Sequence, residues 1–492
     1  MRKAVLAVLA LQLVVTAGVL LALGTGAMPL GVRGEWEWLR IPRSAAPTAM
    51  HWVIGGVAIL GYSAYAGAGM RWLGPVPGRA RELGAVASLF VVSAVIQVLI
   101  ATAAPEGYGL AKWILALHNP GANGYYTVAK TQIGDSWRFL ADYPNWIQRQ
   151  GSLHIGTHPP GLFLLQRGLL NAMEADPAAA RLVLALQPSA VEDAFKAVEQ
   201  YSHLSRADRA ALALTGALTL LLCAATVVPL YALARATLPA NAAWAAACFW
   251  PILPAAILFQ PTADTAFPAL ATTALALAVH ARFGSLRRRL LMSAGAGVVL
   301  ALGMAFSLVF LAIGLIVAAL ILTEPDRSTS LRRRAAALGA TGVGFLVPTL
   351  LGWLVTSSNP FATWWWNQRN HARFYVEYPR TYLAWVVANP VELAVALGLP
   401  ATLWILTGVS RWRTAPRVSL VTLLVLLILT LGGRSLSEVA RLWLPMMPAL
   451  LVAAGAGLTR LGGDRVALGV SIALVGFQTL VLQAMIQCVY PT

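Results

Sequence analysis

Residues 4–24 read AVLAVLALQLVVTAGVLLALG and follow Arg2 and Lys3 at the start of the chain. A transmembrane helix needs about 20 predominantly apolar residues, and this run has that length without a charged side chain. The run is longer than the apolar core of a signal peptide, and it lacks a convincing small-residue cleavage site. We therefore expect a retained signal anchor that crosses a membrane with its N-terminus in the cytoplasm.

The composition of the whole chain agrees with this first run. Hydrophobic residues make up 58% of the 492 residues and charged residues only 11%, and the mean hydropathy is +0.70. Such a chain is typical of a polytopic membrane protein. We expect an all-α fold with about thirteen transmembrane helices, within a range of about eleven to fifteen, because the 290–323 stretch can form one helix or two. The later expected spans are 49–69, 84–104, 211–236, 242–260, 265–281, 290–306, 308–323, 335–356, 383–409, 418–432, 442–460 and 466–486.

Arginine residues mark the loops that we expect in the cytoplasm, because short cytoplasmic loops of membrane proteins accumulate Lys and Arg. With the N-terminus inside, the arginine-rich loops fall on one side of the membrane. Most carboxylates fall on the other side or close to it. The cytoplasmic group then comprises Arg71, Arg79, Arg81, Arg235, Arg282, Arg287–Arg289, Arg327, Arg332–Arg334, Arg411, Arg413, Arg417, Arg460 and Arg465.

The topology requires that the segment 161–209 does not cross the membrane. Its apolar stretches are short, and Asp176-Pro177 and the polar run from Glu192 to Arg209 interrupt them. Amphipathic stretches of this kind lie at the membrane surface. We therefore expect one large non-cytoplasmic loop that carries juxtamembrane helices.

Other classes of protein find little support in the sequence. The net charge of +17 is mainly a topology signal with some attraction to anionic headgroups, and we expect no nucleic-acid partner. Cys223, Cys248 and Cys488 lie in or beside apolar spans without the spacing of a disulfide framework or a zinc site. The sequence contains no Walker motif, dinucleotide fingerprint, G-x-S-x-G motif or fixed-period repeat.

The expected topology brings four polar segments to one outer face: 105–160, 260–264, 364–378 and 434–441. A carboxylate at a membrane surface can deprotonate a hydroxyl group, and arginines can hold a lipid phosphate. Aromatic rings can stack on sugar rings. These are the parts that a transfer of sugar from a lipid phosphate requires.

At these residues the chain resembles the GT-C superfamily of membrane glycosyltransferases, in its protein O-mannosyltransferase and aminoarabinose-transferase branch. The resemblance rests on a long loop with acids, on the His158-Pro159-Pro160 element before an apolar helix, and on Asp264 at an outer helix end. A late Arg-x-x-x-Pro-x-x-Pro run, with Arg441, Pro445 and Pro448, completes it. It covers roughly 84–460, so that residues 1–83, with the two leading helices, look like an addition to a transmembrane domain of residues 84–486.

The resemblance implies an inverting transferase with a polyprenyl-phosphate sugar donor and an active site on the non-cytoplasmic face, in loop 105–209. The acidic Asp-Glu doublet that is usual in this branch is missing, so the catalytic acid is open among Asp135, Asp142 and Glu106. Asp135 ranks first as general base, because the glycine before it permits close approach to a substrate and Trp137 can line a sugar pocket. For any one of these acids, a solvated loop carboxylate or a helix cap is the alternative.

The candidate substrate-binding residues come from all four outer segments. Asp264 can instead cap a helix, and Arg434 and Arg441 can instead reach lipid headgroups. A structural or substrate-contacting role for the histidines is favoured over a metal site, because the two prolines oppose a continued helix, although a divalent ion stays possible. The candidates are Tyr125, Trp137, His154, His158, Asp264, Arg369, His371, Arg434 and Arg441.

Two other functions compete with glycosyl transfer. A transporter or flippase of lipid-linked sugars would place ionisable residues near the bilayer midplane and would show repeats, and Glu392 is the main candidate for such a residue. A polymerase or ligase of lipid-linked glycans would also fit the outer loop. In each case we expect a multi-pass protein of a cell membrane, the bacterial cytoplasmic membrane in particular, with an acceptor that the sequence does not identify.

Overall fold

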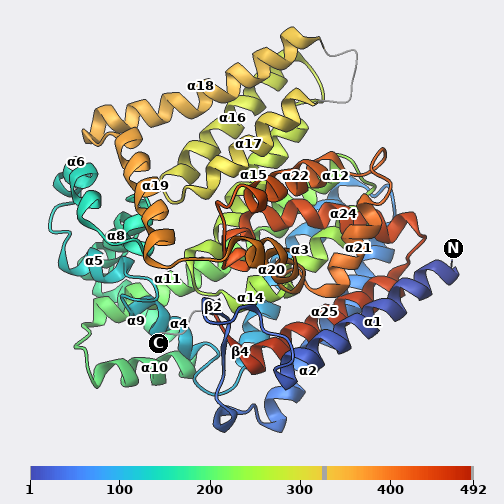
Figure 1. Cartoon of the computed structure of the whole chain (residues 1–492), viewed down its shortest axis with the longest axis horizontal. Coiled ribbons are helices and arrows are strands. Elements are labelled where there is room, and N and C mark those ends of the chain that lie inside the picture. The colour runs from blue at the N-terminus through green and yellow to red at the C-terminus, as the bar shows by residue number, and fades with distance from the viewer. Residues whose placement is uncertain (1, 324–329, 489–492) are drawn as a thin grey trace.

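The computed structural model describes residues 2–323 and 330–488, and most of these residues are helical (Figure 1). Arg327, which we assigned to the cytoplasmic side, lies outside the described residues. The expectation of an all-α chain with the apolar helices of a membrane protein is confirmed at this level. The only strands in the described part are four of two residues each.

The N-terminal part contains three long helices and a small region of strands between the first two. α1 packs against α25 and α21, and α2 packs against α25, α3 and α13, so the two leading helices belong to the body of the molecule. Whether they are an addition at residue 83 stays an interpretation. The elements are α1 (Arg2–Thr25), β1 (Gly31–Val32), β2 (Trp36–Glu37), β3 (Leu39–Arg40), the 3₁₀ helix η1 (Arg43–Ala45), α2 (Ala49–Leu73) and α3 (Arg79–Thr102).

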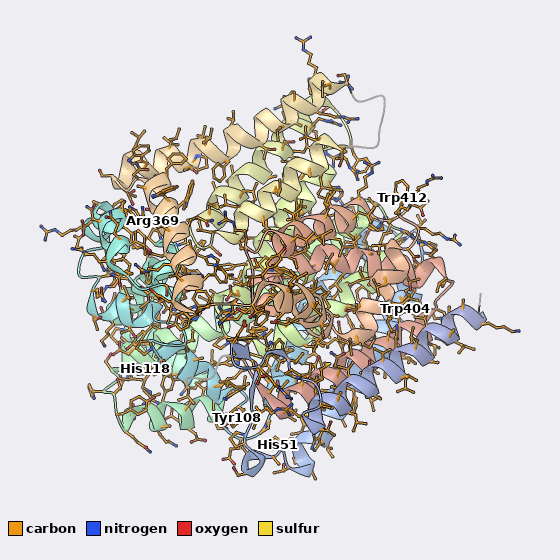
Figure 2. The ribbon with its side chains drawn as sticks, viewed as in Figure 1. His51, Tyr108, His118, Arg369, Trp404 and Trp412 are labelled. Atoms are coloured by element: carbon orange, nitrogen blue, oxygen red, sulfur yellow. The ribbon has the colours of Figure 1, made fainter. Side chains whose placement is uncertain are left out.

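The expected outer loop folds into a layer of short helices. Figure 1 shows this layer at the side opposite the start of α1, and in Figure 2 Arg369 and His118 lie on that side while Trp412 lies on the other. None of these helices is among the candidate membrane spans. They are α4 (Ala111–His118), α5 (Tyr125–Thr131), α6 (Ser136–Trp146), η2 (Ile147–Arg149), α7 (His154–Thr157), α8 (Gly161–Ala175), α9 (Pro177–Ala185) and α10 (Ser189–Glu199).

The middle of the chain forms the buried centre and a peripheral helical group. In the run from Ala240 to Leu258 nearly every residue is buried. The elements are α11 (Arg206–Ala225), α12 (Val227–Arg235), α13 (Ala240–Phe249), η3 (Trp250–Ile252), α14 (Pro254–Leu258), η4 (Ala263–Thr265), α15 (Phe267–His280), α16 (Leu286–Met304), α17 (Val309–Leu322), α18 (Leu331–Thr356) and α19 (Pro360–Glu377).

The C-terminal part returns to the body and ends beside the N-terminal strands. β3 pairs with β4 in antiparallel register, with Leu39 opposite Gln487 and Arg40 opposite Ile486. The elements are α20 (Tyr382–Ala396), α21 (Leu399–Val409), α22 (Arg417–Leu431), α23 (Val439–Leu442), η5 (Leu444–Met446), α24 (Met447–Arg460), α25 (Arg465–Met485) and β4 (Ile486–Gln487).

Close helix pairs depend on glycine, as is common between membrane helices. A Cβ atom on Gly344 of α18 would lie 2.0 Å from the carbonyl oxygen of Ala294 in α16. A Cβ atom on Gly408 of α21 would lie 2.0 Å from the carbonyl oxygen of Ala453 in α24. These backbones therefore touch where a larger side chain would separate the helices.

The expected number of spans is not confirmed. By length and composition, seven helical runs in the described part can cross a membrane, or eight if the bent pair α20–α21 counts as one span. This pair bends by 107°, where the sequence predicted a continuous helix over 383–409. Three further apolar runs, Val309–Leu322, Arg417–Leu431 and Leu444–Arg460, are shorter.

Candidate functional site

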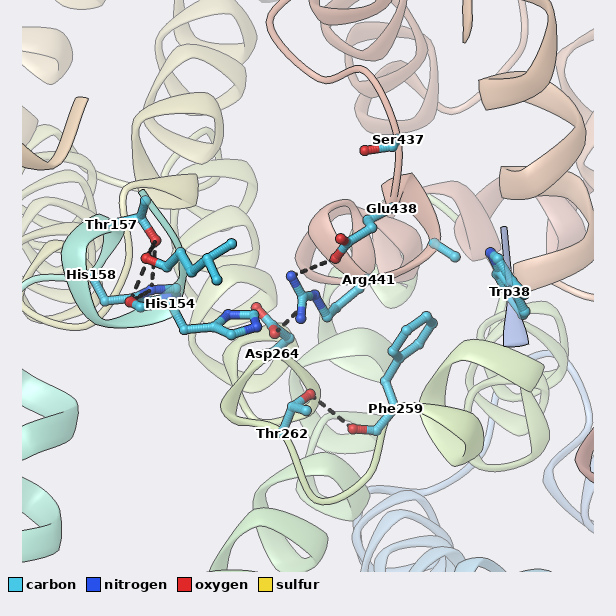
Figure 3. Close-up of polar contacts among 12 residues, drawn as sticks. Trp38, His154, Thr157, His158, Phe259, Thr262, Asp264, Ser437, Glu438 and Arg441 are labelled. Carbon is cyan, nitrogen blue, oxygen red and sulfur yellow. Dashed lines mark hydrogen bonds and ion pairs between the residues drawn. The ribbon is translucent and has the colours of Figure 1, made fainter. Parts of the chain in front are cut away.

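Arg441 lies at the centre of a largely buried group of charged side chains (Figure 3). Its Nη2 lies 2.6 Å from Oε2 of Glu438, and its Nε lies 3.7 Å from Oδ2 of Asp264. The three side chains are between 15% and 24% exposed. Burial is the largest effect on Arg441 and opposes its charge, but Glu438 and Asp264 outweigh it and raise the pKa of the guanidinium. Arg441 is therefore a cation held between two carboxylates.

The turn before Arg441 has an unusual backbone. Ser437 has φ 93° and Glu438 has φ 54°, in the left-handed region that residues with a side chain rarely adopt. Such residues cost about 1–3 kcal/mol each and persist where the surroundings hold them. Arg380 donates from Nε to the Ser437 hydroxyl over 3.4 Å. The fold therefore maintains a strained turn to place Glu438 and Arg441.

The two histidines of the sequence motif face this charged group. His154 begins α7, and Figure 3 shows its ring beside Asp264 and Arg441. The ring centroids of His154 and His158 lie 6.5 Å apart. Burial, followed by Arg441 and His158, holds the pKa of His154 well below its usual value. Burial also lowers the pKa of His158, although Asp264 acts in the opposite direction. Both rings are therefore neutral at pH 7.

The tautomer of His158 follows from one contact. Its Nδ1 lies 2.9 Å from the carbonyl oxygen of His154, and a carbonyl oxygen can only accept a hydrogen bond. In the neutral ring the hydrogen therefore sits on Nδ1, and Nε2 carries a free lone pair. This assignment makes His158 a hydrogen-bond acceptor toward a bound group.

Two asparagines of α19 hold the turn 154–158, the histidine turn, by hydrogen bonds to backbone carbonyl groups. Asn367 donates from Nδ2 to the carbonyl oxygens of Gly156 and His158 over 3.1 and 3.0 Å. Asn370 donates from Nδ2 to those of Ile147 and Gly156 over 3.0 and 2.9 Å. Both asparagines are buried, and a Cβ atom on Gly156 would lie only 1.7 Å from the oxygen of Gly151. The turn is therefore closely packed.

Tyr125 connects the charged group with an apolar groove. Its ring meets that of His158 edge to face at 5.5 Å, and burial, followed by Asp264, raises the pKa of its hydroxyl well above the usual value. The groove holds a cavity of about 150 Å³ between α8, α11 and α15. Its walls include Leu162, Leu165, Leu169, Leu218, Leu222 and Phe267, and Asn123, Tyr125, Gln166 and Thr215 are among its polar members.

The three acids that we predicted as catalytic lie in exposed positions of the short-helix layer. Asp135 caps α6 and accepts a hydrogen bond from the backbone N–H of Arg138 at 2.8 Å. Asp142 accepts from Nδ2 of Asn145 at 3.0 Å and pairs with Arg149 at 3.7 Å. Glu106 is exposed, and Trp137 is 61% exposed. The structure thus gives Asp135 and Asp142 the capping and loop contacts of the alternative interpretation.

The remaining candidates lie around the histidine turn. His371 is influenced by His158 and Arg434, and burial is the largest cause of its lowered pKa. Arg369 is exposed, and its guanidinium carbon lies 5.4 Å from the Trp366 ring centroid. Arg434 is exposed as well. Of the predicted substrate-binding residues, the structure brings together Tyr125, His154, His158, Asp264 and Arg441, with His371 near them.

The sequence interpretation missed several residues with notable contacts in the structure. Lys112 of α4 is buried and donates to the carbonyl oxygen of Leu258 over 2.9 Å, and burial lowers its pKa to about 8. The sequence could have indicated this residue, because Lys112 is the one charged side chain in the apolar run LAKWILAL. Trp38, from the loop after α1, packs edge to face on Phe259 at 5.8 Å. Glu438 was not singled out either.

Within the ranges 2–323 and 330–488, no three His, Cys, Asp or Glu side chains are gathered in a way that would hold a metal ion. In comparisons with known proteins, the sequence matches no family model and no curated protein.

Proposed function

We propose that the protein is a membrane glycosyltransferase that moves a sugar from a polyprenyl-phosphate donor to an acceptor on the non-cytoplasmic face of the membrane. One observation carries the proposal: Tyr125 lines the apolar groove between α8, α11 and α15, and its ring meets that of His158 beside the buried group of Arg441, Asp264 and the histidines. An apolar chain in the groove would bring its polar end to that group. This is the arrangement that a lipid-linked substrate needs.

The charges of the site suit a phosphate only if more than one cation takes part. Arg441 already faces two carboxylates, so it offers little net positive charge alone. Lys112 is a second buried cation, and Lys112 and Arg441 both act electrostatically on the Cys488 thiol. We therefore assign the donor phosphate to Arg441 and Lys112 together.

The reaction requires a base for the acceptor. The acceptor oxygen bonds to the anomeric carbon, the bond from that carbon to the phosphate oxygen breaks, and the polyprenyl phosphate leaves with the electron pair. The hydroxyl proton passes to a carboxylate. Asp264 is the better candidate in this structure, because it lies in the charged group, whereas Asp135 caps an exposed helix.

The test is a transfer assay with purified protein in lipid nanodiscs. Decaprenyl phosphates that carry a labelled neutral hexose or pentose are supplied with a membrane extract as the source of acceptor, and released decaprenyl phosphate is measured. Arg441→Ala should reduce donor use about 10- to 150-fold, because a charge-assisted hydrogen bond at a poorly solvated site contributes about 1.5–3 kcal/mol. Arg441→Lys should recover only part of the donor use, since the lysine ammonium lacks the planar guanidinium that can donate two parallel hydrogen bonds. Wild-type protein that releases no decaprenyl phosphate from any donor would refute the proposal.

A transporter of lipid-linked sugars is the second candidate, and the broken helix favours it. Glu392 is 1% exposed on α20, before the 107° bend into α21, and discontinuous helices with polar groups form transporter binding sites. Movement of a fluorescent decaprenyl-phosphate sugar across liposomes, without release of decaprenyl phosphate, would favour this function over transfer.

A further inference from the structure

Two buried polar side chains on α20 have the same unusual pattern of contacts. Asn389 donates from Nδ2 to the carbonyl oxygen of Ser435 over 2.7 Å. Glu392, about one helical turn later, accepts at Oε1 from the backbone N–H of Ala440 over 3.1 Å. Both side chains thus face the loop that leads to Arg441.

Each of these side chains has a second polar atom without a hydrogen-bond partner. Among the described residues, neither Oδ1 of Asn389 nor Oε2 of Glu392 has a partner, although the two residues are 0% and 1% exposed. Residues three apart on a helix share a face. A buried polar atom without a partner is costly, and each such case calls for an explanation.

The surroundings of Glu392 place its free oxygen in the candidate site. Oε1 accepts two hydrogen bonds, one from Nε1 of Trp38 over 3.2 Å and one from the backbone N–H of Ala440. Glu438 and Arg441 are within electrostatic range of the carboxyl group. Nε of Arg441 also lacks a hydrogen bond, its carboxylate partner being 3.7 Å away. The free oxygens of Asn389 and Glu392 thus lie on one face of α20, and Arg441, with its free donor, directly follows Ala440, which binds Glu392.

We propose that Asn389 and Glu392 form a hydroxyl-binding pair that recognises the ring of a neutral sugar. A sugar carries several hydroxyl groups, each of which donates one hydrogen bond and accepts others, and this matches two acceptors beside one donor. A sugar acid fits poorly, because its carboxylate would meet the carboxylates of Glu438 and Asp264, which face Arg441. This inference rests on the proposed function for the lipid-linked character of the ligand, and it adds the class of sugar.

The variant Glu392→Gln tests sugar binding by Glu392 separately from the structural role of this side chain. The amide oxygen of Gln accepts from Trp38 and Ala440 as Oε1 does, while the amide nitrogen replaces the free oxygen by a donor. The assay is binding to nanodisc-embedded protein of decaprenyl phosphate with no sugar, with mannose or glucose, and with glucuronate. Glu82→Gln is the matched control, because Glu82 accepts from Tyr231 and Arg235 in another part of the body.

The wild type should bind at least one neutral-sugar lipid more tightly than bare decaprenyl phosphate. It should bind the glucuronate lipid no more tightly than bare decaprenyl phosphate. Glu392→Gln should reduce the preference for the sugar by about tenfold or more, with unchanged affinity for bare decaprenyl phosphate and a wild-type melting temperature. Glu82→Gln should keep the full preference. A Glu392→Gln protein that retains the preference overturns the hydroxyl-binding pair and leaves the proposed function standing. A wild type that binds none of the lipids overturns both.

Discussion

At the scale of single residues, the open question is which carboxylate acts as base. Asp264→Asn keeps the shape and removes the basicity, so it should lower turnover about 10²-fold or more and leave donor binding nearly intact. Asp135→Asn should lower turnover far less, because Asp135 caps α6. Steady-state kinetics in the transfer assay measure both. Glu438→Gln is the control for loss of an ion pair to Arg441. If Asp135→Asn abolished turnover while Asp264→Asn stayed active, Asp135 would again rank first as the general base, as the sequence predicted.

The histidines predict how stability depends on pH. His154, His158 and His371 all have pKa values below 6.5 in the folded state. In the unfolded chain they take up protons near pH 6.5, whereas the folded protein does not. Stability is therefore complete above about pH 6.5 and is lost as the pH falls toward the folded-state pKa values. The melting temperature in detergent should fall between pH 7.5 and pH 5.5, and less so in His154→Gln. An equal fall in that variant would remove His154 as a contributor.

Much of the site could be predicted at this scale, and the part that could not has a physical reason. His154, His158, Asp264 and Arg441 came from a motif and from their expected position at helix ends, and the structure brings them together. The ranking of Asp135 relied on neighbours in sequence. Whether an acid caps its own helix or faces a distant arginine depends on long-range packing, which neighbours in sequence do not report.

At the scale of elements, the contact between α7 and α19 should be essential to the site. Asn370→Ala removes one hydrogen bond from each of two buried carbonyl oxygens, those of Ile147 and Gly156, and each such bond contributes about 0.5–1.5 kcal/mol. We expect a lower melting temperature and a loss of transfer activity, because the histidine turn loses its support. Asn145→Ala, at an exposed position, should change neither. Equal melting curves for Asn370→Ala and the wild type would contradict this role of α19.

The helices themselves were largely predictable, but the break inside the expected 383–409 helix was not. The structure places helices in every expected span. Of the two alternatives for 290–323, one helix or two, it shows two, because α16 and α17 are separate around Phe306-Ser307. It breaks the expected 383–409 helix at Gly398, whose φ is 78°, before Pro400. Hydropathy alone does not detect a bend, because both halves stay apolar.

At the scale of the whole molecule, the orientation in the membrane can be tested directly. Cysteines placed at Ser136 and Val376 should react with a membrane-impermeant thiol reagent added to intact cells, because both positions belong to the expected outer face. A cysteine at Ser285 should react only after the membrane is opened. The wild-type protein, with its own three cysteines, gives the background. Labelling of Ser285→Cys alone in intact cells would reverse the orientation.

Composition was enough to predict the class of molecule but not the number of spans. Hydropathy treats an apolar helix in the same way whether it faces lipid or protein. The run from Ala240 to Leu258 is almost wholly enclosed by other helices, whereas α18 is largely open to its surroundings. Short runs such as Val309–Leu322 are apolar without the length of a full span. The class follows from average properties, whereas the span count depends on length and neighbours.

The pairing of β3 with β4 has a consequence for how the protein is made. Leu39 and Arg40 are synthesised before α2 to α25, while their partners Gln487 and Ile486 follow α25. Trp38, directly before β3, carries one of the hydrogen bonds of Glu392. The pairing of β3 with β4 therefore cannot form until α25 has been synthesised. A chain that stopped after Met485 would contain the sequence of every described helix and would lack the partner strand of β3.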